Sequence, residues 1–195
     1  MSGLEIDTPH GPARAHVRPA DDPRGVLVLG HGAGGGVQAR DIVAAAGAAL
    51  AESFSVVLVE QPYRVAGRKS PAPAGQLDAA WTAVIEDLAP SGVLVTGGRS
   101  AGARVACRTA AATGAAGVLC LAFPVHPPGR PEKSRLDELD AVSVPVLIVQ
   151  GESDPFGMPP EASGRTLVKV PGNHSLTGDL ETLSTSVRDW LRLRV

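Results

Sequence analysis

The sequence is poor in aromatic residues and in cysteine. Aromatic residues make up 3% of the chain, and the two cysteines are Cys107 and Cys120. Two cysteines cannot frame a disulfide-stapled fold of this length, and a zinc site would need further ligands. Both lie in apolar stretches, so we predict reduced thiols buried in the core. We expect no metal and no cofactor.

Long apolar runs and basic clusters are also absent. Runs such as Val26–Leu29 and Gly117–Phe123 are far shorter than the roughly 20 residues that a membrane helix needs. No basic segment followed by an apolar stretch opens the chain, so we predict no secretory signal. The formal net charge is −2, and no basic stripe suited to nucleic acid stands out. We therefore expect a cytoplasmic protein with a small-molecule substrate and without nucleic-acid or membrane partners. The oligomeric state stays open.

Apolar runs that suit buried strands alternate with stretches of helical periodicity, which indicates an α/β fold. The predicted strands after residue 18 are Val26–Leu29, Val56–Glu60, Val93–Thr96, Gly117–Ala122, Val144–Gln150 and Thr166–Val170. The predicted helices are Val37–Glu52, Gln76–Leu88, Ala101–Thr113, a turn or two at Leu136–Ala141, and a closing helix through Leu180 and Leu191. Pro62–Gly75 is expected to be an irregular loop.

The order of these elements predicts one domain over residues 1–195, built as three layers. A mostly parallel sheet of about eight strands would carry helices on both faces. Residues 4–18 alternate in polarity around a Pro-His-Gly-Pro turn, which predicts an antiparallel hairpin at the edge of the sheet. Functional groups should collect where the parallel strands end.

Gly98–Gly102 matches the pattern G-x-S-x-G. The motif follows a predicted strand and opens a predicted helix, which is the setting of a nucleophile elbow. The flanking glycines are expected because a Cβ on either side of the tight turn would collide with neighbouring backbone. Ser100 is therefore a candidate nucleophile. The alternative is that Ser100 only caps the helix.

A serine hydroxyl needs a base, and the base needs an orienting carboxylate. Asp154 follows the strand Val144–Gln150, and His174 follows the strand Thr166–Val170. Taken separately, Asp154 is a turn former before a proline and His174 is a loop histidine. Together with Ser100 they follow the chain order Ser, Asp, His of α/β-hydrolases, so we predict a catalytic triad.

Two main-chain N–H groups are candidates for stabilising an oxyanion. The N–H of Ala101 lies beside Ser100 at the start of a helix, and the glycine-rich turn Gly30–Gly35 offers the N–H of Ala33. Glycines let backbone approach a substrate oxygen closely. His31 in this turn is expected to brace the loop rather than to act as a second base.

Five blocks in this order resemble the α/β-hydrolase superfamily, and most closely its small branch near the dienelactone hydrolases. That branch includes hydrolase-like proteins related to a regulatory subunit of a histone-acetyltransferase complex. The resemblance implies the α/β-hydrolase fold with an open, lidless site, Ser100 as nucleophile, Asp154 as acid and His174 as base. We expect a small ester, lactone or thioester as substrate. The blocks are Gly30–Gly35, Gly97–Arg104, Phe123–Gly129, Gln150–Gly157 and Gly172–Leu176.

Two other functions remain open at this point. Gly30–Gly35 also fits G-x-G-x-x-G between a strand and a helix, and Glu60 ends the next strand, as in a dinucleotide-binding protein. The fold could also serve as a non-catalytic binding or scaffold module.

Several cationic side chains are expected near the mouth of the site. They either pair with acids such as Glu60 or recognise a carboxylate or phosphate of the substrate. They are Arg64, Arg68, Lys69, Arg99, Arg104, His126 and Arg130.

Overall fold

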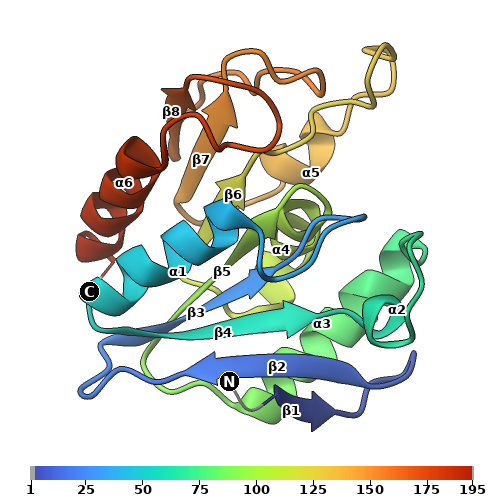
Figure 1. Cartoon of the computed structure of the whole chain (residues 1–195), viewed down its shortest axis with the longest axis vertical. Helices are drawn as coiled ribbons and strands as arrows, with labels where there is room; N and C mark the ends of the chain where they lie inside the picture. The colour runs from blue at the N-terminus through green and yellow to red at the C-terminus, as the bar shows by residue number, and fades with distance from the viewer. Residues whose placement is uncertain (1–2, 195) are drawn as a thin grey trace.

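The computed structural model describes residues 3–194, so residues 1, 2 and 195 of the predicted domain lie outside the described part. It contains an eight-stranded sheet in the order β1-β2-β4-β3-β5-β6-β7-β8, with helices on both faces (Figure 1). The predicted three-layer α/β fold is confirmed. The strands are β1 Gly3–Ile6, β2 Ala13–Arg18, β3 Gly25–Gly30, β4 Phe54–Glu60, β5 Val93–Arg99, β6 Gly117–Leu121, β7 Val146–Gly151 and β8 Arg165–Val170.

The hairpin of β1 and β2 forms the antiparallel edge, as predicted. β2 pairs antiparallel with β4. From β4 through β3 to β8, every neighbouring pair is parallel. Every residue of β6 and β7 is buried, which explains why these strands are apolar on both faces. The parallel order brings the carboxyl ends of β3 to β8 to one edge of the sheet.

Two pairs of helices cover the sheet. α1 (Arg40–Ala51) packs with α6 (Leu180–Arg192) on one face, where alanines of α1 and Leu183, Val187 and Trp190 of α6 join the core. α3 (Ala74–Leu88) and α4 (Ala101–Thr113) cover the other face. Figure 1 shows α1 and α6 side by side. Asp179 caps α6 by accepting the N–H of Thr182 at 2.9 Å, as is typical of helix starts.

Two predictions about helical segments were wrong. The stretch Val37–Glu52 is helical only from Arg40, because residues 37–39 form a turn in which Val37 is buried without being helical. The expected loop Pro62–Gly75 contains the short helix α2 (Pro62–Val65), and α3 begins at Ala74. Pro62 is the first residue of α2, a position where proline is favoured because the N–H there has no helical partner. The prolines therefore open helices here.

Cys107 and Cys120 are both buried free thiols, with their sulfurs 3.6 Å apart. They lie where α4 packs on β6.

The short helix α5 (Leu136–Asp140) follows the proline-rich loop after β6. None of the helices within residues 3–194 is long and apolar enough to cross a membrane.

Candidate active site

Ser100 sits in a strained turn between β5 and α4. Its backbone has φ 52° and ψ −106°, a conformation that costs a non-glycine residue about 1–3 kcal/mol. The flanking glycines permit this turn to pack on the end of β3. A Cβ at Gly98 would lie 2.4 Å from the carbonyl oxygen of Gly30, and one at Gly102 would lie 2.6 Å from the same atom. The glycines of the motif are thus required by close packing.

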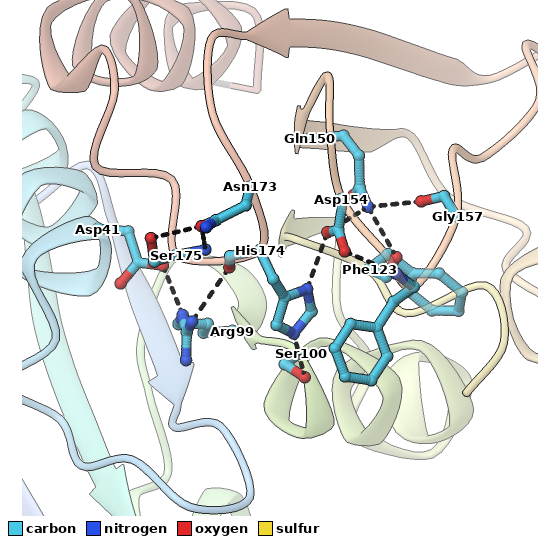
Figure 2. A network of polar contacts seen from close by, with 11 residues as sticks. Asp41, Arg99, Ser100, Phe123, Gln150, Asp154, Gly157, Asn173, His174 and Ser175 are labelled. Atoms are coloured by element: carbon cyan, nitrogen blue, oxygen red, sulfur yellow. Dashed lines mark hydrogen bonds and ion pairs between the residues drawn. The ribbon is translucent and has the colours of Figure 1, made fainter. Parts of the chain in front are cut away.

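The structure brings Ser100, His174 and Asp154 together although they are far apart in the chain. The Nε2 atom of His174 lies 2.9 Å from the Oγ of Ser100, and its Nδ1 lies 2.8 Å from Oδ2 of Asp154. Figure 2 shows the His174 ring between the two side chains. Both distances suit hydrogen bonds. A neutral His174 that donates from Nδ1 would leave Nε2 free to accept the serine proton.

Asp154 is held from several directions. Its side chain is 1% exposed. Oδ1 accepts the backbone N–H of Phe156 at 2.8 Å, and Oδ2 accepts from the amide of Gln150 at 2.8 Å as well as from His174. The carboxylate is therefore fixed in position by three hydrogen bonds.

Gln150 was not among the predicted site residues. It is fully buried at the end of β7, and its amide nitrogen also lies 3.1 Å from the carbonyl oxygen of Phe123 and 2.9 Å from that of Gly157. Figure 2 shows it joining these loops to Asp154. A glutamine that ends an otherwise apolar strand is the signal that could have identified it, because a buried polar group needs partners.

Phe156 was also missed. Its ring stacks on the imidazole of His174, with centroids 4.1 Å apart and planes 28° apart. The stack covers one face of the imidazole and leaves the ring edge to Ser100 and Asp154. Phe156 therefore restricts rotation of the His174 ring.

Arg99 occupies the variable position of the elbow and connects three segments. Its Nε lies 2.7 Å from Oδ2 of Asp41, and its Nη2 donates to the backbone carbonyl of His174 at 3.0 Å. A Cβ at Gly32 would be 3.1 Å from its Nη1. Asp41 is 1% exposed. Burial raises the pKa of the Asp41 carboxyl, and the Arg99 guanidinium opposes that rise. Arg99 thus links the elbow, the start of α1 and the His174 loop.

His31 braces the turn that carries Ala33. The Nδ1 of His31 donates to the carbonyl of Gly32 at 2.8 Å, and its Nε2 accepts the N–H of Gln61 at 3.1 Å. Burial lowers the pKa of His31, against the opposing effect of the Gly32 bond. The hydroxyl of Tyr63 donates to the carbonyl of Ala33 at 2.8 Å. The turn is therefore fixed at both ends by hydrogen bonds.

A cavity of about 270 Å³ lies over Ser100. Ala33 and Ala101, the two residues whose N–H groups were predicted to meet an oxyanion, line the same cavity. Ala101 is the first residue of α4, so its N–H has no partner within the helix. The other lining residues are Pro71, Ala72, Ala74, Leu77, Arg104, Arg108, Pro124, Arg135 and Phe156.

Glu60 does not pair with the arginines expected near the site. Its carboxylate lies 3.0 Å from Nε2 of His16 and 3.8 Å from Nη1 of Arg14. Arg104 pairs instead with Glu138 at 2.5 Å. His126 is bonded to the carbonyl of Pro127 at 2.9 Å. Arg130 and Lys69 are exposed. The sequence could not supply the partners of Glu60 and Arg104, because they lie on β2 and α5, more than 30 residues away in the chain.

A known protein family matches most of this chain. The sequence profile described as an alpha/beta hydrolase domain matches residues 23–179. The chain belongs to the α/β-hydrolase family. No sequence among the curated proteins matches it significantly. Within residues 3–194, no three His, Cys, Asp or Glu side chains gather in a way that could hold a metal ion.

Solved structures of α/β-hydrolases share the fold of this one. XC6422 from Xanthomonas campestris, described as an α/β serine hydrolase without lid, is 23% identical with a TM-score of 0.78, over 98% of this chain and 94% of that one. Est1E from Butyrivibrio proteoclasticus, solved with ferulic acid bound, is 18% identical with a TM-score of 0.78, over 98% of both chains. A dienelactone hydrolase from Anabaena variabilis is 14% identical with a TM-score of 0.74, over 98% of this chain and 96% of that one.

Proposed function

We propose that this α/β-hydrolase is a serine hydrolase that cleaves small carboxylic esters, lactones or thioesters through an acyl-enzyme on Ser100. The observation that carries the proposal is the continuous path of short contacts from Asp154 Oδ2 through both nitrogens of His174 to Ser100 Oγ, 2.8 and 2.9 Å long. Such an arrangement activates a serine that is otherwise a weak nucleophile. Esters and lactones suit the relatives described as a serine hydrolase and a dienelactone hydrolase.

The first half of the reaction forms the acyl-enzyme. Ser100 Oγ attacks the carbonyl carbon of the substrate while its proton passes to Nε2 of His174. Asp154 stabilises the imidazolium that results. The carbonyl oxygen becomes an oxyanion facing the N–H groups of Ala33 and Ala101, which line the same cavity as Ser100. The bond to the leaving group then breaks, and the leaving oxygen or sulfur takes the proton from His174.

The second half of the reaction releases the acid. Water attacks the acyl carbon and gives its proton to His174, so that a second tetrahedral oxyanion forms at the same place. This intermediate collapses, the bond to Ser100 Oγ breaks, and His174 returns the proton to the serine oxygen. The products are the carboxylic acid and the free enzyme. Side chains and main-chain donors of this chain supply every step, so we expect activity to persist in EDTA.

Labelling with a fluorophosphonate tests the nucleophile without knowledge of the substrate. The probe should attach to the wild-type protein, and Ser100→Ala should abolish labelling while the circular-dichroism spectrum stays unchanged. Ser70→Ala is the matched control because Ser70 is exposed on the loop before α3. A binding or scaffold module, the alternative from the sequence, would give no label in the wild type. Equal labelling of the wild type and Ser100→Ala would remove Ser100 from the mechanism.

A further inference from the structure

The cavity over Ser100 is lined by arginines and by apolar residues. Arg104, Arg108 and Arg135 line it, and none of its lining residues is an aspartate or glutamate. The remaining wall is small or apolar, with Leu77 and Phe156 as its largest members. A ligand in this cavity would therefore meet positive charge beside an apolar surface.

Two of the three arginines form ion pairs with carboxylates that do not line the cavity. Arg104 donates to both oxygens of Glu138, at 2.7 and 2.5 Å. Arg108 donates to both oxygens of Asp78, at 2.8 and 2.6 Å, and its Nη1 lies 3.1 Å from Glu138. Burial by itself would raise the pKa of Glu138, but the two guanidiniums outweigh it and lower that pKa. Two arginines thus share two carboxylates.

Arg135 has no such partner. Within residues 3–194 its side chain makes no hydrogen bond or ion pair, although its backbone is fixed. Its N–H donates to the carbonyl of Val125 at 2.7 Å, and its own carbonyl accepts the N–H of Glu138 at 3.2 Å. Burial and the nearby Arg104 lower the pKa of Arg135, against the opposing charge of Glu138, which makes no direct contact with its side chain, but a guanidinium stays charged at neutral pH. The arginine cluster, defined as Arg104, Arg108, Arg135, Asp78 and Glu138, therefore has one positive charge left over.

We propose that Arg135 binds a carboxylate at the far end of the substrate's acyl chain, and this inference rests on the proposed hydrolase function. A guanidinium can bind a carboxylate through two parallel hydrogen bonds. Leu77, Ala72 and Phe156 would then line the methylene chain between the two ends. The substrates are monoesters or thioesters of short dicarboxylic acids.

The size of the cavity limits the chain length. A volume of about 270 Å³ is just below the usual range for ligand pockets, roughly 300–1,000 Å³. This volume favours short acyl chains, such as that of adipic acid, over long fatty acids.

A matched pair of substrates tests this specificity. The 4-nitrophenyl monoester of adipic acid carries the distal carboxylate, and its methyl ester is a neutral analogue with the same acyl chain. Arg135→Gln should lower kcat/KM for the anionic ester by about 10- to 100-fold, as expected for loss of a charged hydrogen-bonded pair. It should change the neutral ester by no more than about twofold. Arg135→Lys should recover part of the loss, because it restores the charge without the planar fork.

Arg130→Gln is the control, since Arg130 is exposed on the same loop and does not line the cavity. It should leave both substrates unchanged. Raising the salt concentration should weaken the preference of the wild type for the anionic ester. The proposal would be overturned if Arg135→Gln lowered kcat/KM equally for both esters, or left kcat/KM for the anionic ester unchanged.

Binding separates this proposal from the proposed function. If Ser100 is not labelled and neither ester is cleaved, the hydrolase function fails, but titration of adipate into the wild-type protein still tests the subsite. Saturable binding that is at least about tenfold weaker in Arg135→Gln supports a carboxylate site. Absence of adipate binding to the wild type, or equal binding by the variant, contradicts it.

Discussion

The two sides of His174 are built in different ways. On the acid side, defined as Gln150, Asp154 and Phe156, all partners come from one short segment at the end of β7. On the arginine side, defined as Asp41 and Arg99, the partners come from the start of α1 and the end of β5. Figure 2 shows Gln150 and Asp154 on one side of His174, and Asp41 and Arg99 on the other. One side is local in the chain and the other is assembled from distant segments.

This difference assigns different tasks to the two sides. The acid side contacts the imidazole ring itself, through Asp154 at Nδ1 and the stacked ring of Phe156. The arginine side contacts only the backbone carbonyl of His174. It therefore sets the position of the loop, whereas the acid side sets the orientation of the ring. Substitutions on the acid side should lower kcat more, and substitutions on the arginine side should lower the unfolding free energy more.

The largest effect is expected at Asp154. Asp154→Asn should lower kcat for an activated ester by about 10⁴-fold, because an amide no longer favours the tautomer in which Nε2 accepts the serine proton. Ester hydrolysis and thermal unfolding, measured on the same preparation, check this. Asp140→Asn is a control, since Asp140 is exposed and pairs with Arg165 away from the site. A loss of less than tenfold in Asp154→Asn would mean that His174 is oriented by other groups.

At Arg99 we expect a smaller kinetic loss. Arg99→Met removes the bond to the His174 carbonyl, and a displacement of about 1 Å can cost roughly 100-fold in kcat. The same change leaves Asp41 buried without its partner, which typically costs about 3–5 kcal/mol. Urea unfolding and ester hydrolysis should therefore both be affected.

The double variant Arg99→Met/Asp41→Asn separates the two effects. Asparagine is close to aspartate in size and can keep the bond that Oδ1 accepts from the N–H of Ile42. Stability should recover most of its loss because no unpaired charge is buried, while kcat should stay low. Recovery of both quantities together would show that Arg99 acts only on stability.

The same contrast explains what could be predicted from the sequence. Ser100, Asp154 and His174 each follow an apolar run within a short motif, so local pattern was enough to select them. Asp41 and Glu138 could not be assigned as partners of Arg99 and Arg104, because those ion pairs depend on where helices and loops of distant segments come to lie. The fold followed from alternating strands and helices. The predicted segments were wrong at the start of α1 and where prolines opened helices instead of loops.

Gln150 offers a milder test of the acid side. Gln150→Met keeps the volume of the side chain but removes the donor to Asp154 and to the carbonyls of Phe123 and Gly157. Leaving such buried acceptors unpaired costs about 1–3 kcal/mol, and we expect kcat to fall by about tenfold. The unfolding free energy and the hydrolysis rate provide the measurements. If kcat falls as far as in Asp154→Asn, Gln150 has a more direct part in the reaction.

The smallest effect concerns His31, on the turn that faces the arginine side. Burial lowers its folded-state pKa below the ordinary value of 6.5. The unfolded chain therefore takes up this proton first as the pH falls, and the stabilising contribution, complete above pH 6.5, is lost toward lower pH. One proton changes the unfolding free energy by at most about 1.4 kcal/mol per pH unit. We measure the unfolding free energy in urea between pH 7.5 and 5 for the wild type and for His31→Gln. The free energy should fall less steeply with decreasing pH in the variant. Equal slopes in the two proteins would mean that the pKa of His31 does not change on folding. Protonation in the folded protein would also break the bond in which Nε2 accepts from Gln61, so the turn that carries Ala33 should loosen only as the pH falls through the lowered folded-state pKa.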